Sequence, residues 1–504
     1  MQPLNHKALG EIKKQGAYNT IISYIGIVLG FVNILVLQPI MLEPENLGLL
    51  KVLTSSAILI GTIFPLGING YTLKYFPVFK DKSQQHNGFL SLLVLVTTFN
   101  FAIAAILLSI FKEHFIAYYQ DHSPQFASVY PYVLPIGFCV GFTSVITVFV
   151  FNLFKTIIPS IINDVVARLM MIAVTLMYFL KYLDFGSFLF AVFIIYLLQL
   201  LVLFVYALKL NGKMKWPSKK ILNDIGIGSS YRFMLIIALA SISSIALRNV
   251  DVMMLGSYCN MSTVAVYSIA VTIGTIIEAP VTSLARIADA KIADAFANHR
   301  MHEVQKIYFD SSRILTIVGL FLFASVISNV SDLLQYLPQA YSSGYDVIVI
   351  ISLSAVFNMI TGINNSIIFY SNNHNKGTIL LLLLIVVAIF LHRILIPMYG
   401  QIGAAIVTAG TLFLFNLAKL VMIQANLKIQ PFEKKTLFIL LTFAISLSCN
   451  LISISLPLLN VFIKESVIGI VFLSGIMYWN LMPEYRFEKY IPFAERLFRK
   501  SGSV

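Results

Sequence analysis

Residues 248–296 read RNVDVMMLGSYCNMSTVAVYSIAVTIGTIIEAPVTSLARIADAKIADAF, two apolar runs separated by a short turn. The hydrocarbon core of a bilayer is about 30 Å thick, and about 20 apolar residues in a helix cross it. The second run carries Glu278 and Pro280 near its middle and Arg286 toward its end. The pattern predicts two membrane helices joined by a tight turn, with ionisable groups inside them.

These ionisable groups are costly in a membrane. A charge near the bilayer centre costs about 2.5–3.5 kcal/mol on insertion scales, so such a residue faces a partner or a watery cavity. Arg248 and Asp251 are three positions apart, share one helical face and can pair. Glu278 and Arg286 are separated by about 12 Å along an ideal helix. Glu278 and Asp251 are therefore candidates for ion coupling or ion pairing, and we expect Glu278 to face a cavity.

The composition is that of a polytopic membrane protein. Hydrophobic residues make up 58% of the 504 positions and only 11% are charged, a balance that soluble domains do not show. The formal net charge of +13 would suit a nucleic-acid partner, but the basic residues lie in short segments between apolar runs. We therefore expect no nucleic-acid partner.

Cysteine and histidine usage predicts no metal site and no cofactor. The chain has three cysteines, none in a C-x-x-C spacing, and we interpret them as small apolar fillers. His299 and His302 lack a carboxylate or cysteine companion at ligand spacing.

The apolar runs predict about fourteen membrane helices and an all-α fold. The first run, 17–42, is too long for the core of a signal peptide and should remain as a spanning helix. The other spans are expected near 47–71, 88–111, 128–152, 161–183, 185–208, 228–250, 262–288, 313–331, 346–370, 377–397, 402–424, 435–456 and 463–482.

The linker KLNGKMKWPSKK (209–220) is the most basic segment and contains a Trp-Pro pair, so it reads as a joint between two halves. The sequence predicts five parts. They are a six-helix bundle at 1–208, a cytoplasmic linker at 209–224, a second six-helix bundle at 225–430, two further helices at 431–483, and an amphipathic cytoplasmic tail at 484–504.

The distribution of Lys and Arg predicts the orientation. With both termini in the cytoplasm, only six of the 35 basic residues fall on the outer side, as the positive-inside rule requires. These six are Lys51, Lys112, Lys181, Arg248, Arg393 and Lys464. The least secure step is the short turn KYLD between the helices at 161–183 and 185–208.

Several motifs resemble one known family. They are LEPENLGLLKVLTSS and PLGINGYTLKYFPVF in the first half, and RNVDVMMLG, VAVYSIAVTI and YGQIGAAIVTAGT in the second. In order and spacing they resemble the polysaccharide transporter family, the bacterial O-antigen and oligosaccharide flippases of the multidrug, oligosaccharidyl-lipid and polysaccharide exporter superfamily. The resemblance extends to about residue 430.

The resemblance implies two six-helix bundles around a central cavity, with two extra helices at the carboxyl end, as in multidrug extrusion proteins. It also implies an activity, the movement of an undecaprenyl-diphosphate-linked oligosaccharide from the cytoplasmic to the periplasmic leaflet by alternating access. Such a chain would work in the bacterial inner membrane among its lipids, as a transporter and not an enzyme. The carried glycan, the coupling ion, the oligomeric state and any association with polysaccharide assembly proteins stay open.

The helices that flank the cavity in this family suggest the site residues. Guanidinium forks suit phosphate oxygens, so we nominate Arg232, Arg248 and Arg286 for the diphosphate. The amides nominated for sugar hydroxyls are Asn19, Asn33 and Asn69. Arg168 is a further cation that could instead anchor its helix at the interface, and Pro39, Pro65 and Pro280 mark points where helices can bend.

Three other functions compete with this one. A lipid II flippase would need a similar cationic cavity. A cation-coupled drug antiporter would use a carboxylate in the first bundle, where the first helix offers only Asn19 and Asn33, and Glu278 is the one deep carboxylate that the sequence indicates. A membrane polymerase or glycosyltransferase would need a large outer loop with paired carboxylates, and the longest outer loop is only 112–127.

Overall fold

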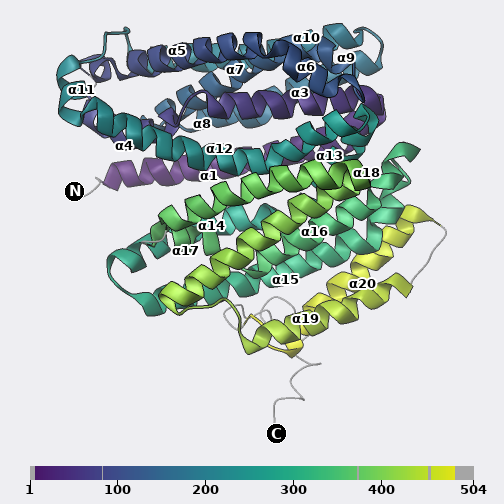
Figure 1. Ribbon diagram of the computed structural model, residues 1–504. Helices are drawn as coiled ribbons and strands as arrows, with labels where there is room; N and C mark the ends of the chain where they lie inside the picture. Colours follow the sequence, from purple (N-terminus) through teal and green to yellow (C-terminus); the bar gives the residue numbers. More distant parts are fainter. Residues whose placement is uncertain (1–5, 82, 372–373, 452–455, 483–504) are drawn as a thin grey trace. The chain divides into compact units, whose positions relative to one another are not determined.

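The computed structural model describes residues 6–81, 83–371, 374–451 and 456–482. Every regular element within these ranges is a helix (Figure 1). Hydrocarbon offers no hydrogen-bond partner, so an apolar run there forms a helix, which satisfies its own backbone groups. Thirteen helices in this part of the chain are long and apolar enough to cross a membrane. The predicted all-α polytopic fold is confirmed.

The predicted count of about fourteen differs because of one element, α18 (His374–Leu427). Its membrane candidate, Lys376–Leu427, has 52 residues and would extend about 78 Å as one straight helix, more than twice the hydrocarbon thickness. Gly400 lies inside it with φ 56° and ψ −133°, backbone angles that glycine adopts at low cost. The two helices predicted at 377–397 and 402–424 lie on either side of this interruption.

The chain forms two compact units. The first is Met1–Ile269 with Ile385–Ala404, and the second is Ala270–Leu384 with Ala405–Val504. The predicted bundles at 1–208 and 225–430, with two more helices at 431–483, stay a prediction. The tail at 484–504 lies outside the described residues.

The first unit contains α1 (His6–Phe31), η1 (Val32–Leu37), α2 (Gln38–Met41), α3 (Pro44–Ile63), α4 (Ile68–Phe79), η2 (Gln85–Gly88), α5 (Phe89–Ile110), α6 (Lys112–Gln120), α7 (Phe126–Asn152), α8 (Ile157–Ser160), η3 (Ile161–Val166), α9 (Ala167–Phe179), α10 (Phe185–Asn211), α11 (Lys219–Ile225) and α12 (Ile227–Tyr258). The second unit contains η4 (Ile276–Glu278), α14 (Ala279–Ala297), α15 (Met301–Leu334), η5 (Gln339–Gly344), α16 (Tyr345–Ile360), α17 (Asn364–Tyr370), α19 (Lys434–Ser446), η6 (Leu447–Leu451) and α20 (Pro457–Tyr478). Two helices, α13 (Met261–Thr275) and α18, belong partly to each unit.

In the first unit, α3 packs against α7 and α12. Small residues allow close approach of helices in a membrane, and a Cβ atom on Gly61 of α3 would lie 2.9 Å from the carbonyl oxygen of Gly137 on α7. Near the other end of α3, a Cβ atom on Gly48 would lie 1.8 Å from the carbonyl oxygen of Met261. Glycine is therefore required where these backbones meet.

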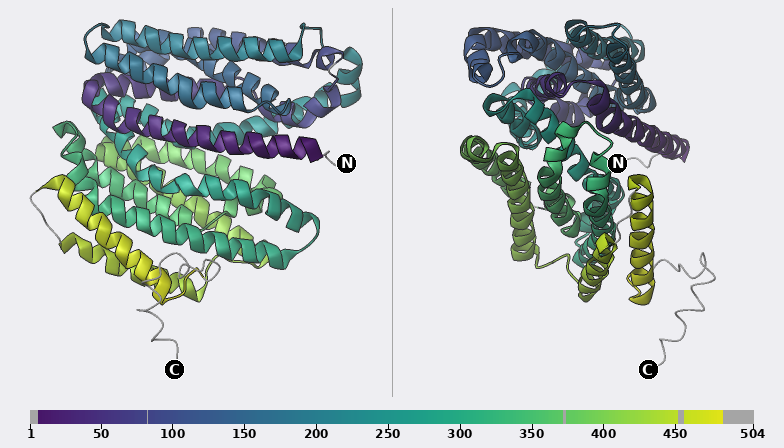
Figure 2. Two further views of the ribbon diagram at one scale, coloured as in Figure 1. Left: turned by 180° about the vertical axis from the view of Figure 1, so that it is seen from behind. Right: turned by 90° about the vertical axis from the view of Figure 1, so that its right-hand side faces the viewer.

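In the second unit, α15 is the central helix and contacts α14, α16, α19 and α20. Its buried residues, among them Tyr308 and Leu315, form one apolar core with Ile292, Met359 and Ile468 from the surrounding helices. Figure 2 shows α20 (yellow) beside the other helices of this unit. The last spanning helix is therefore part of the core of the second unit.

Each of the three prolines proposed as bending points lies at a helix interruption. Pro39 is the second residue of α2, which directly follows the π-helix η1. Pro65 lies in the break between α3 and α4, which Gly67 completes with φ 74°. Pro280 follows the 3₁₀ segment η4 at the start of α14. Because proline lacks an amide hydrogen, the helical hydrogen-bond ladder is locally broken at each position.

Contacts within the first unit group the loops into two ends. At one end, the Tyr119 hydroxyl donates to the Met253 carbonyl at 2.9 Å and Asn46 Nδ2 donates to Tyr178 Oη at 3.0 Å. At the other end, the Ser218 amide donates to the Asn87 carbonyl at 3.0 Å. All the loops grouped at one end are predicted to lie on the same side of the membrane. These contacts therefore agree with the predicted alternation of the helices across the membrane.

The short turn KYLD, the least certain point of the predicted topology, contains a helix N-cap. The α9 helix ends at Phe179 and α10 begins at Phe185. The Asp184 carboxylate accepts from the Gly186 amide at 3.1 Å and from the Ser187 hydroxyl at 2.6 Å. These hydrogen bonds, that from Ser187 foremost, lower the pKa of Asp184, as expected for an ionised N-cap.

We predict that Gly48→Ala lowers the free energy of unfolding by about 1–3 kcal/mol, because its Cβ atom would overlap a backbone carbonyl that cannot move alone. The matched control is Gly469→Ala on α20, where a Cβ atom meets nothing within 4 Å. It should stabilise the chain by about 0.5–1 kcal/mol through helix propensity. Unfolding of both purified variants in detergent measures the difference, and equal effects would contradict the close approach at Gly48.

Candidate functional site

The three amides nominated for sugar contacts lie in the first unit. Asn19 Nδ2 donates to Thr156 Oγ1 at 2.6 Å, and Asn69 Nδ2 donates to Ser144 Oγ at 2.8 Å. Asn33 is buried in the π-helix η1. In all three, the amide oxygen is buried and has no hydrogen-bond partner among the described residues. Each amide therefore keeps one acceptor, while Asn19 and Asn69 also hold segments together.

Asp251 is a buried acid in α12. Its Oδ2 atom accepts from the Tyr267 hydroxyl of α13 at 2.6 Å, and its Oδ1 atom accepts from the Val252 amide at 2.8 Å. Both Asp251 and Tyr267 are at most 2% exposed. The carboxylate therefore joins α12 to α13, and its predicted pairing with Arg248 stays a prediction.

Arg248 lies deeper in its helix than the sequence indicated. The predicted helix ended near residue 250, just before the polar Asp251, but α12 continues to Tyr258. Arg248 is therefore about 15 Å from the nearer end of the helix, and its side chain is exposed. The predicted helix near 228–250 therefore ends about eight residues too early, and the buried Asp251, whose partner is Tyr267, lies inside α12.

The remaining nominated residues lie nearer to helix ends or interruptions. Arg232 is exposed in the second turn of α12. In the second unit, Glu278 is half-buried in the 3₁₀ segment η4, and Arg286 is exposed on α14 at the last residue of its candidate span. The eight nominated residues are thus divided between the units, six in the first and only Glu278 and Arg286 in the second.

Arg168 is an anchor within the first unit. Its Nη1 atom donates to the carbonyl oxygen of Gly26 on α1. The backbones are close there, because a Cβ atom on Gly26 would lie 2.8 Å from the Asp164 carbonyl oxygen. Of the two roles considered for Arg168, this contact favours anchoring, here to the neighbouring helix.

Sequence reasoning missed polar contacts whose members come from different spans. In the first unit, Gln199 Nε2 donates to Asn163 Oδ1 at 2.7 Å and Asn163 Nδ2 donates to Thr147 Oγ1 at 3.3 Å. Lys51 Nζ donates to Gln38 Oε1 at 3.0 Å. The sequence shows only a single polar residue within each apolar run. Such a residue indicates a buried position, but it does not show which residue of another span it contacts.

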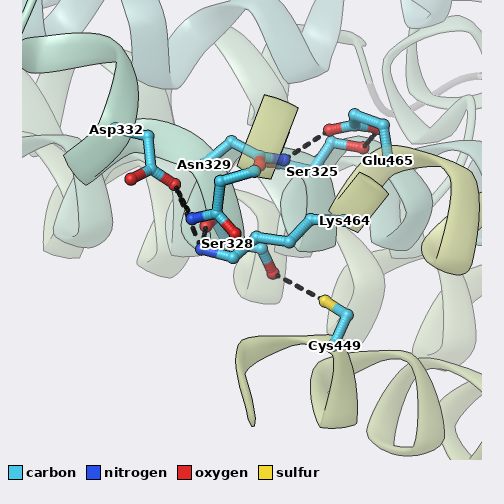
Figure 3. A network of polar contacts seen from close by, with 8 residues as sticks. Ser325, Ser328, Asn329, Asp332, Cys449, Lys464 and Glu465 are labelled. Atoms are coloured by element: carbon cyan, nitrogen blue, oxygen red, sulfur yellow. Dashed lines mark hydrogen bonds and ion pairs between the residues drawn. The ribbon is translucent and has the colours of Figure 1, made fainter. Parts of the chain in front are cut away.

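A second missed group joins α15 and α20 in the second unit (Figure 3). Lys464 Nζ lies 3.1 Å from Asp332 Oδ2 and donates to the Ser328 carbonyl at 3.0 Å. Asn460 Nδ2 donates to the same Asp332 oxygen at 2.8 Å. The ion pair is largely buried, with side chains 11% and 14% exposed. It crosses between two membrane helices.

Glu465 lies next to this ion pair. Its two carboxylate oxygens accept from Asn329 Nδ2 at 2.6 Å and from the Ser325 hydroxyl at 2.9 Å. Glu465 is the ninth residue of α20, about 12 Å along the helix from its start. The sequence argument named Glu278 as the only deep carboxylate, and the structure corrects this by adding Glu465.

Within the described ranges, no group of three or more His, Cys, Asp and Glu side chains could hold a metal ion. All three cysteines are free, and Cys139 and Cys449 are buried. The polar chemistry of the described residues is therefore that of amides, hydroxyls, guanidinium groups and a few carboxylates, which bind ligands through hydrogen bonds and charge.

Comparison with solved structures shows the fold. The lipid II flippase MurJ, in an inward closed conformation, superposes with a TM-score of 0.73 at 14% sequence identity, over 92% of this chain and 99% of that chain. A multidrug resistance transporter of the MATE family, from the MOP superfamily, in an outward-facing conformation, gives a TM-score of 0.47 at 13% identity, over 83% of this chain and 96% of that chain. The chain is thus a multi-pass membrane protein with a MurJ-like fold.

Comparison of sequences shows the family. No curated protein matches the chain. A family described as "Polysaccharide biosynthesis protein" matches residues 12–288, more than half of the sequence. The matched region includes the first unit up to Ile269 and the stretch with Arg248 and Glu278. The chain therefore belongs to the polysaccharide biosynthesis protein family.

Proposed function

We propose that this chain is a flippase for an undecaprenyl-diphosphate-linked oligosaccharide, such as an O-antigen, capsule or exopolysaccharide repeat unit. It would move this lipid from the cytoplasmic to the periplasmic leaflet. The observation that supports this best is the position of Arg248, an exposed residue about 15 Å from the nearer end of α12. A cation so deep in a span needs a watery or anionic environment, and a diphosphate supplies the second.

The physical task explains the residue types. Sugar hydroxyls and a diphosphate lose strong hydration in hydrocarbon, so the lipid crosses slowly by itself. Arginine offers a planar fork of donors that matches phosphate oxygens. Asn19, Asn33 and Asn69 each retain a buried amide oxygen without a hydrogen-bond partner among the described residues, and the proposal requires that these oxygens become accessible to sugar hydroxyls during the transport cycle. The proposal assigns the diphosphate to the arginines and the sugar to the amides.

Alternating access needs helices that change shape, and the interruptions at Pro39, Pro65 and Pro280 suit this requirement. They divide long spans into shorter rigid pieces. Two of the interruptions lie in the first unit and the third lies in the second. The proposal therefore places helix bending during transport at these three interruptions.

A lipid II flippase is the nearest alternative, because the solved MurJ structure of similar fold carries that name. Both substrates join a sugar to a polyprenol through a diphosphate, so the arginines suit either one. The family description favours a polysaccharide precursor. Competition between the two lipids for export by the purified, reconstituted chain discriminates between them.

We also propose that the chain lies in the bacterial inner membrane with both termini in the cytoplasm. The contacts that group 79–88 with 209–218 at one end of the first unit agree with this assignment, as does the basic character of both segments.

We predict that Arg248→Ala reduces export at least about tenfold, because a hydrogen bond to a charged group contributes about 1.5–3 kcal/mol. Arg286→Ala should also reduce export. Arg248→Lys should give an intermediate rate, since it keeps the charge and loses the fork. The measurement is uptake of a fluorescent lipid-linked oligosaccharide into the far leaflet of proteoliposomes.

The matched control for these variants is Arg300→Ala. Arg300 is also exposed, but it forms ion pairs with Glu303 and Asp294 outside the spans. It should export at the parent rate. Parent-level export by both Arg248→Ala and Arg286→Ala, at equal membrane insertion, would remove the two arginines from the site.

We predict that cysteine labelling in intact cells will agree with the proposed orientation. Lys215→Cys in the linker should be protected from a membrane-impermeant maleimide, and His122→Cys in the 112–127 loop should react. Both positions are exposed, and Cys259→Ser in the parent removes the only cysteine that is not buried. Labelling of Lys215→Cys from outside would overturn the proposed topology.

A further inference from the structure

Three ionisable residues lie together between two membrane helices of the second unit. Asp332 comes from α15, and Lys464 and Glu465 come from α20 (Figure 3). Ser325, the partner of Glu465, is about 14 Å from the end of α15, and Glu465 is about 12 Å from the start of α20. Glu465 and its partners therefore lie at matching depths within two spans, where an uncompensated charge is costly.

The charges of this group do not balance. Lys464 and Asp332 neutralise each other at 3.1 Å. Glu465 receives hydrogen bonds only from the neutral groups of Ser325 and Asn329, and no Lys, Arg or His of the described residues lies within 4.0 Å of it. By formal charge the group therefore holds two carboxylates, Asp332 and Glu465, against the one ammonium of Lys464.

Two oxygen atoms of the same group also lack partners. Asn329 and Asn460 are 2% and 4% exposed, and the Oδ1 atom of each is buried without a hydrogen bond among the described residues. Their orientation is fixed, because in each the amide nitrogen donates to a carboxylate, to Glu465 or to Asp332. A flipped amide would turn its oxygen toward a negative oxygen.

We propose that this group is a binding site for a small monovalent cation of the sodium type. Hard cations prefer carboxylate, amide and hydroxyl oxygens, and Glu465, Asn329 and Ser325, which contact one another, supply all three. One positive charge neutralises the group, whereas a divalent ion would leave it positive. A bound proton would neutralise the group as well, and the experiment distinguishes it from sodium.

The site lies across the contact between α15 and α20. An ion bound there adds a connection between the core of the second unit and its last spanning helix, beside the Lys464 and Asp332 ion pair. That such an ion supplies energy for export rests on the proposed function. Binding itself does not, and it can be tested without any lipid substrate.

The experiment measures the thermal unfolding midpoint of the purified full chain in detergent, in sodium chloride against choline chloride at constant ionic strength. Saturating sodium should raise the parent midpoint by about 3 °C or more, because a ligand that binds only the folded state stabilises it. Glu465→Gln should lose this response. It should also melt at or above the parent in choline chloride, because the neutral amide needs no counter-ion.

The control is Asp346→Asn, which removes an exposed carboxylate from the first turn of α16 in the same unit and should respond to sodium like the parent. Ser325→Ala keeps the charge and should weaken binding of radioactive sodium several-fold, which serves if Glu465→Gln does not fold. A purely structural Glu465 would instead destabilise Glu465→Gln in every salt. Equal midpoints of the parent in the two salts, an unchanged response of Glu465→Gln, or stabilisation by acid alone would overturn the site.

Discussion

Hydrocarbon cannot donate or accept a hydrogen bond, and this constraint governs every polar group inside the spans. The backbone meets it by forming helices. Side chains meet it by binding one another, as Asp251 binds Tyr267 and Asn69 binds Ser144. Where the backbone ladder is broken, as at Pro65 and Pro280, the breaks are short. The helical backbone and the side-chain contacts therefore both satisfy polar groups that hydrocarbon cannot.

The constraint also explains how much of the fold was predictable. Apolar runs indicate membrane-spanning helices directly, so the all-α polytopic fold and the approximate position of most spans followed from the sequence, although about fourteen spans were predicted and thirteen candidates are found in the described residues. Helix ends were harder to predict, because polar residues inside a span, such as Asp251, are accommodated by partners on other helices, here Tyr267, that the local sequence does not show. The interruption at Gly400 agrees with the break predicted between 397 and 402, but its φ of 56° could be seen only in the structure.

The candidate site was predictable only in part. An arginine in an apolar run is conspicuous, which is how Arg248 was found, but its depth depended on where α12 ends. Asp332 and Lys464 are 132 residues apart, and nothing local pairs them. Lys464 counted only as one of a few basic residues on the outer side. Which polar residues of different spans contact each other is therefore visible only in the structure, because composition and local sequence do not show it.

Charged residues in these spans fall into two groups. Arg168 donates to a backbone carbonyl and Asp251 accepts from a buried hydroxyl, so their hydrogen-bonding capacity serves helix packing. Arg248 is exposed, and Glu465 has only neutral donors and lies beside amide oxygens without partners. Packing explains the first pair. The two proposals assign the other residues to ligands, Arg248 to an anionic lipid and Glu465 to a small cation.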